Sequence, residues 1–253
     1  MKVVENSKYK ISNGAYLWKY IDFYKLGHFL ETKALYFTRL DLFEDPLEGL
    51  SAEGLRNRYL LRAVPDDEDR NPRISLQDYE ALKQEMVSRN IVTDLEREGM
   101  KQRFASCWFL SESESLAMWN LYSDSGGLAI RFPANALIDT VSKAAMYIED
   151  SCWPQLILGK VIYVDISEIK KQRFLGFRKV RAYEHEKEFR FMTVCASNEL
   201  KDSFELKLGD IQTLRFDLVS HPLMEKWKQK VLKKMLNNYH VADRLTPSSI
   251  ILT

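Results

Sequence analysis

Hydrophobic residues along this chain follow two different periods. Short apolar or alternating runs predict β-strands at residues 16–21, 34–38, 104–110, 127–132, 156–164, 188–194, 214–219 and 250–252. Apolar positions three or four residues apart predict helices after Asp22, from 75 to about 97, over 116–122, from 133 to about 145, and from 222 to about 239. Strands and helices that do not alternate strictly indicate an α+β fold.

We therefore expect a single domain over residues 1–253, with a mixed or antiparallel β-core and flanking helices. The stretch 50–103 departs from this pattern. Ser75, Leu76, Gln77 and Asp78 resemble a capping box and open a long helical period. We predict that 50–103 forms a helical insertion or lid over the β-core.

Composition narrows the class of protein. Of 253 residues, 45% are hydrophobic, which is enough to form a substantial core. Basic and acidic residues number 37 and 36, so overall charge favours neither nucleic acid nor an anionic membrane, although a local basic patch remains open. The sequence shows no signal peptide or membrane-spanning run, and its three cysteines are widely separated. These features predict a soluble cytoplasmic protein without a membrane partner.

The densest group of charged residues lies between Glu184 and Arg190. Alternation along a strand would place Glu186, Glu188 and Arg190 on one face, and Lys187 with the two phenylalanines on the other. Two carboxylates and a guanidinium on one strand face must either lie in water or pair with other charges. This segment is the first place to look for a functional site.

Two further segments carry candidate ligand-binding residues. Trp119 and Tyr122 are three residues apart and share one face of the predicted helix 116–122. They are either core residues or a flat surface on which a nicotinamide or adenine ring stacks. Asp45 precedes a proline in the loop 43–49, where it serves either a plain turn or a ligand.

Several common active-site motifs are absent. The four histidines and three cysteines show no paired spacing of metal ligands, so we expect no metal site. No glycine-rich phosphate loop supports a Walker ATPase or a Rossmann dehydrogenase. Cys107 lies in an apolar strand without a nucleophile elbow around it, which favours a buried small hydrophobe over a catalytic thiol.

An ordered set of short motifs covers nearly the whole chain. In order, these are Leu17-Trp18-Lys19-Tyr20, Phe43-Glu44-Asp45-Pro46-Leu47-Glu48, Ser106-Cys107-Trp108-Phe109, Met118-Trp119-Asn120-Leu121-Tyr122, Gly127-Leu128-Ala129-Ile130-Arg131-Phe132, Glu186-Lys187-Glu188-Phe189-Arg190 and His221-Pro222. The set resembles a bacterial and phage family of uncharacterised domains. Glu44 departs from the asparagine usual there, and Ser125-Gly126 is shorter than the usual stretch.

The order of these motifs is also similar to that of small ADP-ribosyltransferases. That resemblance implies NAD as the substrate. Lys19 or Tyr20 would lie on the opening strand, Tyr122 with Trp119 against the nicotinamide, and Glu186 or Glu188 at the nicotinamide ribose. A carboxylate there stabilises the oxocarbenium charge that develops as the N-glycosidic bond breaks. Because Arg190 and Glu188 share a strand face, we expect them to form a pair that positions Glu186 or Glu188 for a ligand.

The leading hypothesis is an NAD-binding, ADP-ribosyltransferase-like or NAD-consuming effector, with phage defence as its setting. A second hypothesis is a non-catalytic sensor module that binds a nucleotide or a protein. A third is a nucleic-acid-processing enzyme, which the even charge and the lack of a metal motif disfavour. The sequence identifies neither a protein target nor a nucleic-acid target.

Overall fold

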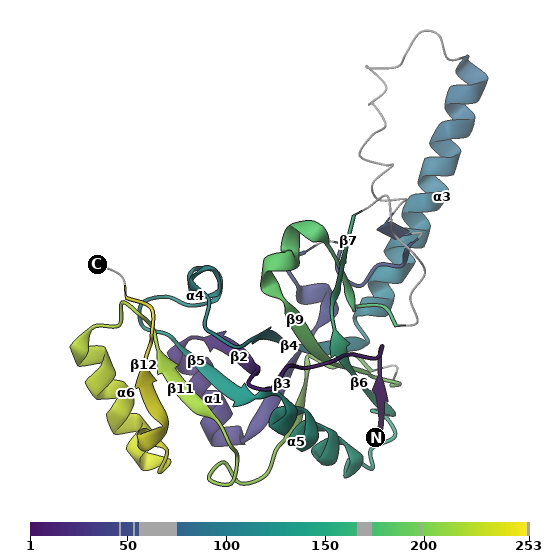
Figure 1. Cartoon of the computed structure of the whole chain (residues 1–253). Helices are drawn as coiled ribbons and strands as arrows, with labels where there is room; N and C mark the ends of the chain where they lie inside the picture. Colours follow the sequence, from purple (N-terminus) through teal and green to yellow (C-terminus); the bar gives the residue numbers. More distant parts are fainter. Residues whose placement is uncertain (46, 53, 56–74, 166–173, 198, 252–253) are drawn as a thin grey trace.

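The fold comes from a computed structural model that describes residues 1–45, 47–52, 54–55, 75–165, 174–197 and 199–251. Within them, ten strands form one mixed sheet, accompanied by α-helices and short 3₁₀ helices (Figure 1). The α+β class predicted from the sequence is confirmed. In the same residues, no helix is both long and apolar enough to span a bilayer.

The sheet follows an order unrelated to the order along the chain. Its path is β1 (Lys2–Glu5), β6 (Gln155–Lys160), β9 (Glu188–Val194), β4 (Arg103–Ser111), β2 (Tyr16–Ile21), β5 (Leu128–Pro133), β11 (Asp217–Ser220) and β12 (Leu245–Pro247). A side branch is made by β3 (Ala34–Arg39), which pairs with β4, and by β10 (Ser203–Lys207), which pairs with β3. The β1–β6 and β11–β12 pairs are parallel, and the other pairs of this sheet are antiparallel.

The remaining elements surround this sheet. A small parallel pair is formed by β7 (Ile162–Val164) and β8 (Arg178–Val180). The α-helices are α1 (Phe23–Thr32), α3 (Leu76–Met100), α4 (Leu116–Tyr122), α5 (Ala134–Met146) and α6 (Lys226–Asn238), and the 3₁₀ helices are η1 (Leu40–Leu42), η4 (Arg181–Glu186) and η5 (Ala242–Arg244).

The two faces of the sheet are packed differently. One face is covered by α1, α5 and α6, whose buried residues, among them Leu30, Leu137 and Leu236, join the large hydrophobic core. The other face carries two smaller clusters, one that includes Met192 and one that includes Trp18. Alternation along β9 produces this division, because Phe189 and Phe191 join the large core while Met192 joins a smaller cluster.

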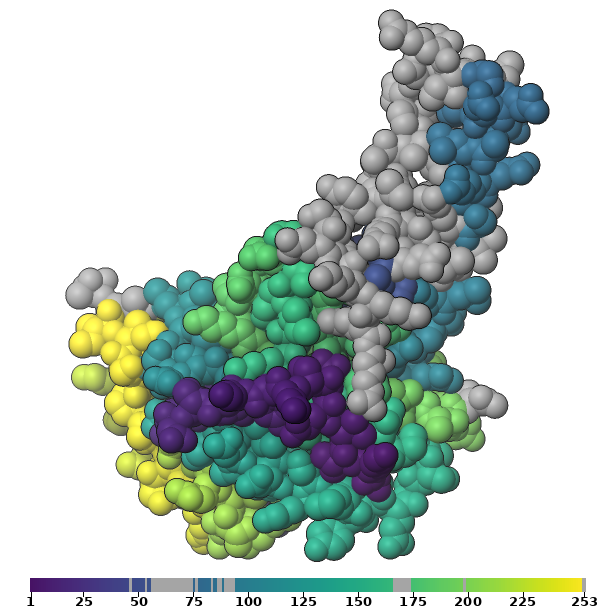
Figure 2. Space-filling model, turned by 45° about the vertical axis from the view of Figure 1, so that its right-hand side comes forward, coloured from purple at the N-terminus to yellow at the C-terminus, as the bar shows by residue number. Residues whose placement is uncertain are grey.

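The helix α3 projects away from the sheet (Figures 1 and 2). It begins as predicted, with the Ser75 side chain accepting a hydrogen bond from the backbone N–H of Asp78 at 3.1 Å. It supplies most of the described helical residues in the stretch predicted as an insertion. Residues 56–74 of that stretch lie outside the described part of the chain. The N-terminal segment (purple) lies on the surface of the body in Figure 2.

Three predicted strands need correction. The run 156–164 is divided between β6 and β7, because the chain changes sheets at Val161, whose N–H donates to the Glu188 carbonyl at 2.9 Å. The run 214–219 becomes β11 only from Asp217. The last strand, β12, precedes the predicted 250–252, where Ile250 and Ile251 belong to no strand and 252 lies outside the described residues.

A left-handed residue ends α1 just before β3. Lys33 has φ 56° and ψ 32°, and it is exposed. We predict that Lys33→Gly stabilises the protein by about 1 kcal/mol, because glycine adopts this conformation without steric cost. The matched control Lys25→Gly, inside α1, should destabilise by a similar amount. Urea unfolding of both variants measures this, and the same sign for the two would contradict it.

Candidate functional site

The sheet opens where β2 and β3 separate along one edge of β4. β3 pairs with β4 at Phe104 and Ala105, and β2 pairs with it again only from Phe109. Between these points, no strand among the described residues pairs with this edge. The Cys107 carbonyl on this edge is bonded to a side chain instead, because Lys19 Nζ of β2 donates a hydrogen bond to its oxygen at 2.9 Å. A half-buried lysine side chain, rather than a ladder of backbone hydrogen bonds, thus bridges this gap.

A cavity of about 530 Å³ lies over this gap, between the two smaller hydrophobic clusters. Its volume is in the range of small-molecule sites. The aromatic residues that line it come from five segments of the chain and are Trp18, Tyr20, Phe43, Trp108, Phe109, Tyr122 and Tyr183. The charged residues that line it are Lys19, Lys179, Glu44, Asp45, Glu48, Glu186 and Glu188. This combination of rings and carboxylates is suited to an aromatic or positively charged ligand.

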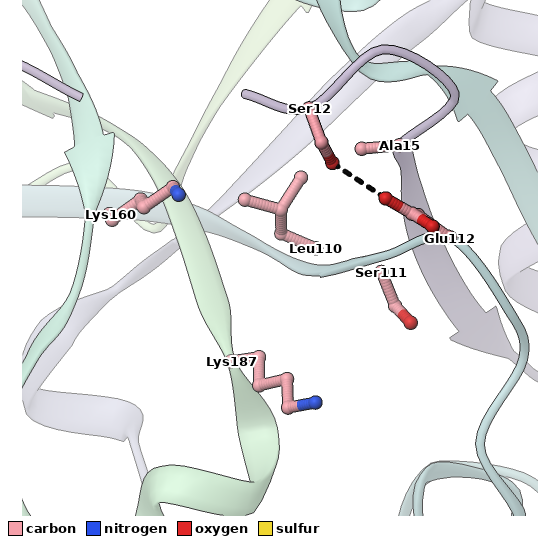
Figure 3. A pocket seen from close by; sticks show the side chains of 7 residues that line it. All are labelled: Ser12, Ala15, Leu110, Ser111, Glu112, Lys160 and Lys187. Atoms are coloured by element: carbon pink, nitrogen blue, oxygen red, sulfur yellow. Dashed lines mark hydrogen bonds between the residues drawn. The ribbon is translucent and has the colours of Figure 1, made fainter. Parts of the chain in front are cut away.

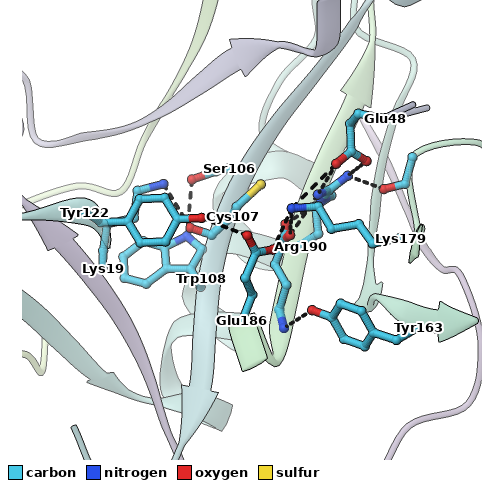
Figure 4. A network of polar contacts seen from close by, with 12 residues as sticks. Lys19, Glu48, Ser106, Cys107, Trp108, Tyr122, Tyr163, Lys179, Glu186 and Arg190 are labelled. Atoms are coloured by element: carbon cyan, nitrogen blue, oxygen red, sulfur yellow. Dashed lines mark hydrogen bonds and ion pairs between the residues drawn. The ribbon is translucent and has the colours of Figure 1, made fainter. Parts of the chain in front are cut away.

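Arg190 is the centre of a buried ion network beneath the cavity (Figure 4). Its guanidinium donates to both oxygens of Glu188, with Nε–Oε1 at 2.6 Å and Nη2–Oε2 at 2.8 Å. A third nitrogen, Nη1, donates to Glu48 Oε1 at 2.8 Å and to the Gly176 carbonyl. Arg190 has no exposed side-chain surface, so these acceptors, together with the Phe43 ring 5.5 Å from its Cζ, take the place of water around the guanidinium. Glu188 and Arg190 share a strand face, as alternation predicted.

Lys179 of β8 connects this network to the cavity wall. Its Nζ lies 2.6 Å from Glu186 Oε2, 3.3 Å from Glu188 Oε2 and 3.6 Å from Glu48 Oε2. Tyr122 reaches the other side of Glu186, where its hydroxyl donates to Oε1 at 2.9 Å (Figure 4). Glu186 is therefore fixed between a cation and a phenol at the edge of the cavity.

Glu186 reaches this position without being part of the strand. It is the last residue of η4, and Lys187 follows in the left-handed region with φ 38°. β9 begins only at Glu188. The prediction that one strand carries Glu186, Glu188 and Arg190 is therefore correct for the last two residues. Glu186 joins them because the turn at Lys187 redirects the chain toward Tyr122.

The network changes the proton affinity of its members in opposite directions. Burial tends to raise the pKa of Glu188, but Arg190 and Lys179 outweigh it and lower that pKa to about 2. Burial raises the pKa of Glu48, which receives weaker help from the same cations and is repelled by Glu188. Lys179 also loses hydration, yet its anionic neighbours raise its pKa above the ordinary value. Of Glu188 and Glu48, Glu188 is the one whose lowered pKa keeps it ionised.

The predicted site residues do not all meet at the cavity. Lys19, Tyr20, Asp45 and Tyr122 line it together with Glu186 and Glu188, whereas Arg190 lies behind its wall. Trp119 does not line it. That ring is 0% exposed, packs edge-on against Tyr20 at 4.8 Å, and donates its Nε1–H to Glu114 at 2.9 Å. Of the two interpretations of Trp119, the structure supports the core aromatic and removes it as a stacking surface.

Three of the residues that do line the cavity are already engaged within the protein. Burial lowers the pKa of Lys19, and its Nζ is bonded to a carbonyl. The Tyr20 hydroxyl accepts from the Ser115 N–H at 2.9 Å. Asp45 Oδ1 accepts from the Leu47 N–H at 2.9 Å, which closes the turn that the sequence predicted. The Tyr122 hydroxyl is engaged with Glu186 as well, but the residue is 48% exposed, so its ring is open to a ligand.

Comparisons with known proteins leave the family open, because no family model, curated protein or solved structure matches the chain. The resemblances suggested by the sequence motifs therefore stay predictions, and the chemistry is argued from the site itself. No set of three His, Cys, Asp or Glu side chains in the described ranges is placed to hold a metal ion. The carboxylates of the network instead take Lys179 and Arg190 as their cations.

Sequence reasoning missed three members of the site and left a fourth unassigned. Lys179 and Tyr183 belong to a segment with no strong period, and Tyr163 lies in the divided strand β7, where its hydroxyl accepts from the Glu188 N–H at 2.8 Å. Glu48 belongs to the motif of the loop 43–49, where only Asp45 is predicted as a ligand-binding residue. Cys107 lines the cavity as well, and burial raises the pKa of its thiol, which agrees with an unreactive residue.

A second hollow, of about 340 Å³, lies beside Lys187 (Figure 3). Its polar groups are largely occupied by one another and by the backbone. The Ser12 hydroxyl donates to Glu112 at 2.8 Å, and Lys160 donates to the Lys10 carbonyl at 2.8 Å. It lacks the aromatic lining of the larger cavity, which we take as the site.

The burial of Arg190 generates a stability prediction. Arg190→Ala should lower the free energy of unfolding by about 3–5 kcal/mol, because Glu188 and Glu48 would lose their partner away from water. The control is Arg181→Ala, which breaks the half-exposed Arg181–Asp165 pair and should cost about 0–1 kcal/mol. Urea unfolding compares the two variants, and equal losses would show that the network contributes no more than a surface pair.

The lowered pKa of Glu188 generates a pH prediction. Because its folded pKa, about 2, lies below the ordinary 4.5, its ionised form stabilises the fold above about pH 4.5. That contribution is lost as the pH falls toward 2. Glu188→Gln should therefore be less stable than wild type at about pH 6, and the difference should shrink toward about pH 3. Unfolding free energies across this range test it, with exposed Glu184→Gln as the control. A difference that stays constant would contradict it.

Proposed function

We propose that this protein binds NAD and cleaves the bond between nicotinamide and ribose, passing ADP-ribose to water or to a target molecule. The observation that carries the proposal is the position of Glu186, held by Tyr122 and Lys179 at the wall of an aromatic cavity. A fixed carboxylate stabilises a developing positive charge without reorganising during the reaction. The sequence resemblance to ADP-ribosyltransferases implies Tyr122 and either Glu186 or Glu188, and does not include Lys179.

The charge of the cavity supports a positively charged reacting group. Two lysines and five carboxylates line it, a formal excess of three negative charges that Arg190 behind the wall reduces to two. Nicotinamide in NAD is a pyridinium ring, which a carboxylate and aromatic faces both attract. The doubly negative pyrophosphate has no such partner here, so we expect it to lie toward the solvent. Lys19, engaged with a carbonyl, is a weak partner for it.

The proposed reaction needs no group beyond substrate and protein. The bond between ribose C1′ and the ring nitrogen breaks, and its electron pair leaves with nicotinamide, which becomes neutral. The remaining ribosyl oxocarbenium lies near Glu186, whose charge stabilises it more than the ground state. A hydroxyl oxygen from water or a target then adds to C1′ and loses its proton.

Glu186 and Glu188 have different parts in this proposal. Glu188 is paired through both oxygens with Arg190, so its charge is largely neutralised within the network. Each oxygen of Glu186 accepts one hydrogen bond, from Tyr122 or from Lys179, and retains a free lone pair. We assign the contact with the ribose to Glu186, and the positioning of Lys179 to Glu188.

The second function is a non-catalytic nucleotide sensor. It is favoured by the complete pairing of the network, which is as suitable for holding a ligand as for reacting with one. The two functions differ in one observable, the release of nicotinamide from bound NAD.

We predict that wild-type protein releases nicotinamide from NAD and that Glu186→Gln lowers kcat by roughly 10²–10³-fold, because the amide cannot balance the oxocarbenium charge. Tyr122→Phe should cost about tenfold, the effect of one hydrogen bond. Chromatography of nicotinamide measures turnover, and thermal unfolding verifies that each variant is folded. The control Glu184→Gln, exposed and outside the cavity, should keep full activity.

Other outcomes redirect or end the proposal. Full activity in Glu186→Gln with loss in Glu188→Gln would move the ribose contact to Glu188. NAD binding without nicotinamide release would select the sensor. Absence of NAD binding by calorimetry at millimolar concentration would reject the proposed reaction and NAD as the ligand of the sensor.

A further inference from the structure

The helix α6 carries a charge that the rest of the protein does not share. Its 13 residues include five lysines and no acidic residue. Because the whole chain is formally +1 and α6 contributes +5, the remaining residues together are formally −4. The even overall balance therefore conceals a local concentration of positive charge at one side of the molecule, away from α3 (Figure 1).

Four of these lysines form one stripe. At about 100° per residue, Lys226, Lys230, Lys233 and Lys234 fall within roughly 100° of the helix circumference. All four are exposed. The opposite side of α6 is buried in the large core through its leucines. The stripe, defined by these four residues, thus faces solvent over about 12 Å of helix length.

The stripe is not neutralised from within the protein. Among the described residues, none of its four lysines forms an ion pair, whereas Lys228, outside the stripe, pairs with Glu225 at 2.9 Å. Like charges at i,i+4, as in Lys226 with Lys230 and Lys230 with Lys234, each destabilise a helix by about 0.2–0.5 kcal/mol. The arrangement therefore works against the isolated helix, and no carboxylate of the described residues forms an ion pair with the stripe.

An exposed indole accompanies the stripe. Trp227 is 60% exposed and lies on α6 directly beside the lysines. Val231, the next residue along that side, is 53% exposed. A helix that lies on a membrane buries its apolar face in the lipid. The apolar face of α6, with Leu232 and Leu236, is turned into the protein core instead. Its outward side offers lysines and only Trp227 and Val231 as apolar residues, which suits a charged strand with accessible rings better than a lipid surface.

We propose that α6 is a docking surface for single-stranded nucleic acid. The lysines of the stripe contact successive phosphates, and Trp227 stacks on an unpaired base. Basic tracks with an adjacent aromatic side chain are the usual means of binding single strands without sequence preference. The proposal uses no residue of the cavity and is independent of the function proposed for it.

The test is fluorescence anisotropy with a labelled single-stranded oligonucleotide and with its duplex. Replacing all four stripe lysines with glutamine should abolish most binding and reduce the slope of log K against log salt by about 3, near 0.7 for each phosphate contact. Trp227→Ala should weaken single-strand binding by roughly five- to a hundredfold and leave duplex binding almost unchanged. All these residues are exposed, so thermal unfolding should remain close to that of wild type.

The matched control replaces four other exposed lysines, Lys8, Lys10, Lys143 and Lys207, with glutamine, which makes the same change in net charge. It should bind as wild type does. An equal loss in this control would overturn the proposal, because binding would then follow net charge alone. So would the absence of binding by wild type at about 0.1 mM, the weak end of non-specific affinity. Sedimentation with phosphatidylserine vesicles, without binding to the oligonucleotide, would assign α6 to a membrane instead.

Discussion

The pairing of Arg190 with Glu188 and Glu48 determines how the two halves of the site come together. It connects β9 to the loop after β3, two segments 142 residues apart in the chain. A guanidinium with no exposed surface is tolerated only when its nitrogens are bonded, and here they reach two carboxylates and the carbonyl of Gly176. Gly176 has φ 92°, and a Cβ there would lie 2.9 Å from the Met192 sulfur. Because Arg190 needs all of these acceptors, it fixes the Glu48 loop, β9 and Gly176 relative to one another.

The same network explains why a cavity persists at the gap in the sheet. A gap between strands normally closes, because unpaired backbone groups lose hydrogen bonds. Here Lys19 donates a hydrogen bond to the Cys107 carbonyl, and the ion network ties the loop that carries Glu48 to β9. The cavity therefore retains aromatic walls and a carboxylate at its edge. Because the ion network supports the cavity wall rigidly, the Glu186 carboxylate can act on a ligand without moving.

Charges of opposite sign are concentrated in different regions of this protein, although its total charge is close to zero. Carboxylates are in excess at the cavity, while lysines are concentrated on α6. The two regions lie on different parts of the sheet, so a cationic group and an anionic strand can bind without competing for the same residues. The net charge of +1 reveals neither the excess of carboxylates at the cavity nor the excess of lysines on α6, because the two cancel in the sum.

Local periodicity determined much of the fold. The apolar pattern located β2, β3, β4, β5 and β9 and the helices α1, α3, α4, α5 and α6, because each buries one face and so repeats at its own period. It also placed Glu188 and Arg190 on one strand face, where they pair. Short strands such as β1 and β8 were not predicted, since three or four residues are too few to show a periodic pattern.

Only the tertiary structure decided which of these residues meet. Lys179 gives no local pattern, yet it lies within 3.6 Å of three carboxylates from two separate segments. Trp119 and Tyr122 share a helix face in sequence, but one is enclosed by Tyr20 and His221 while the other reaches Glu186. Sequence determines the period of each element through local sterics and burial. The site depends on long-range packing and charge pairing, which no local period encodes.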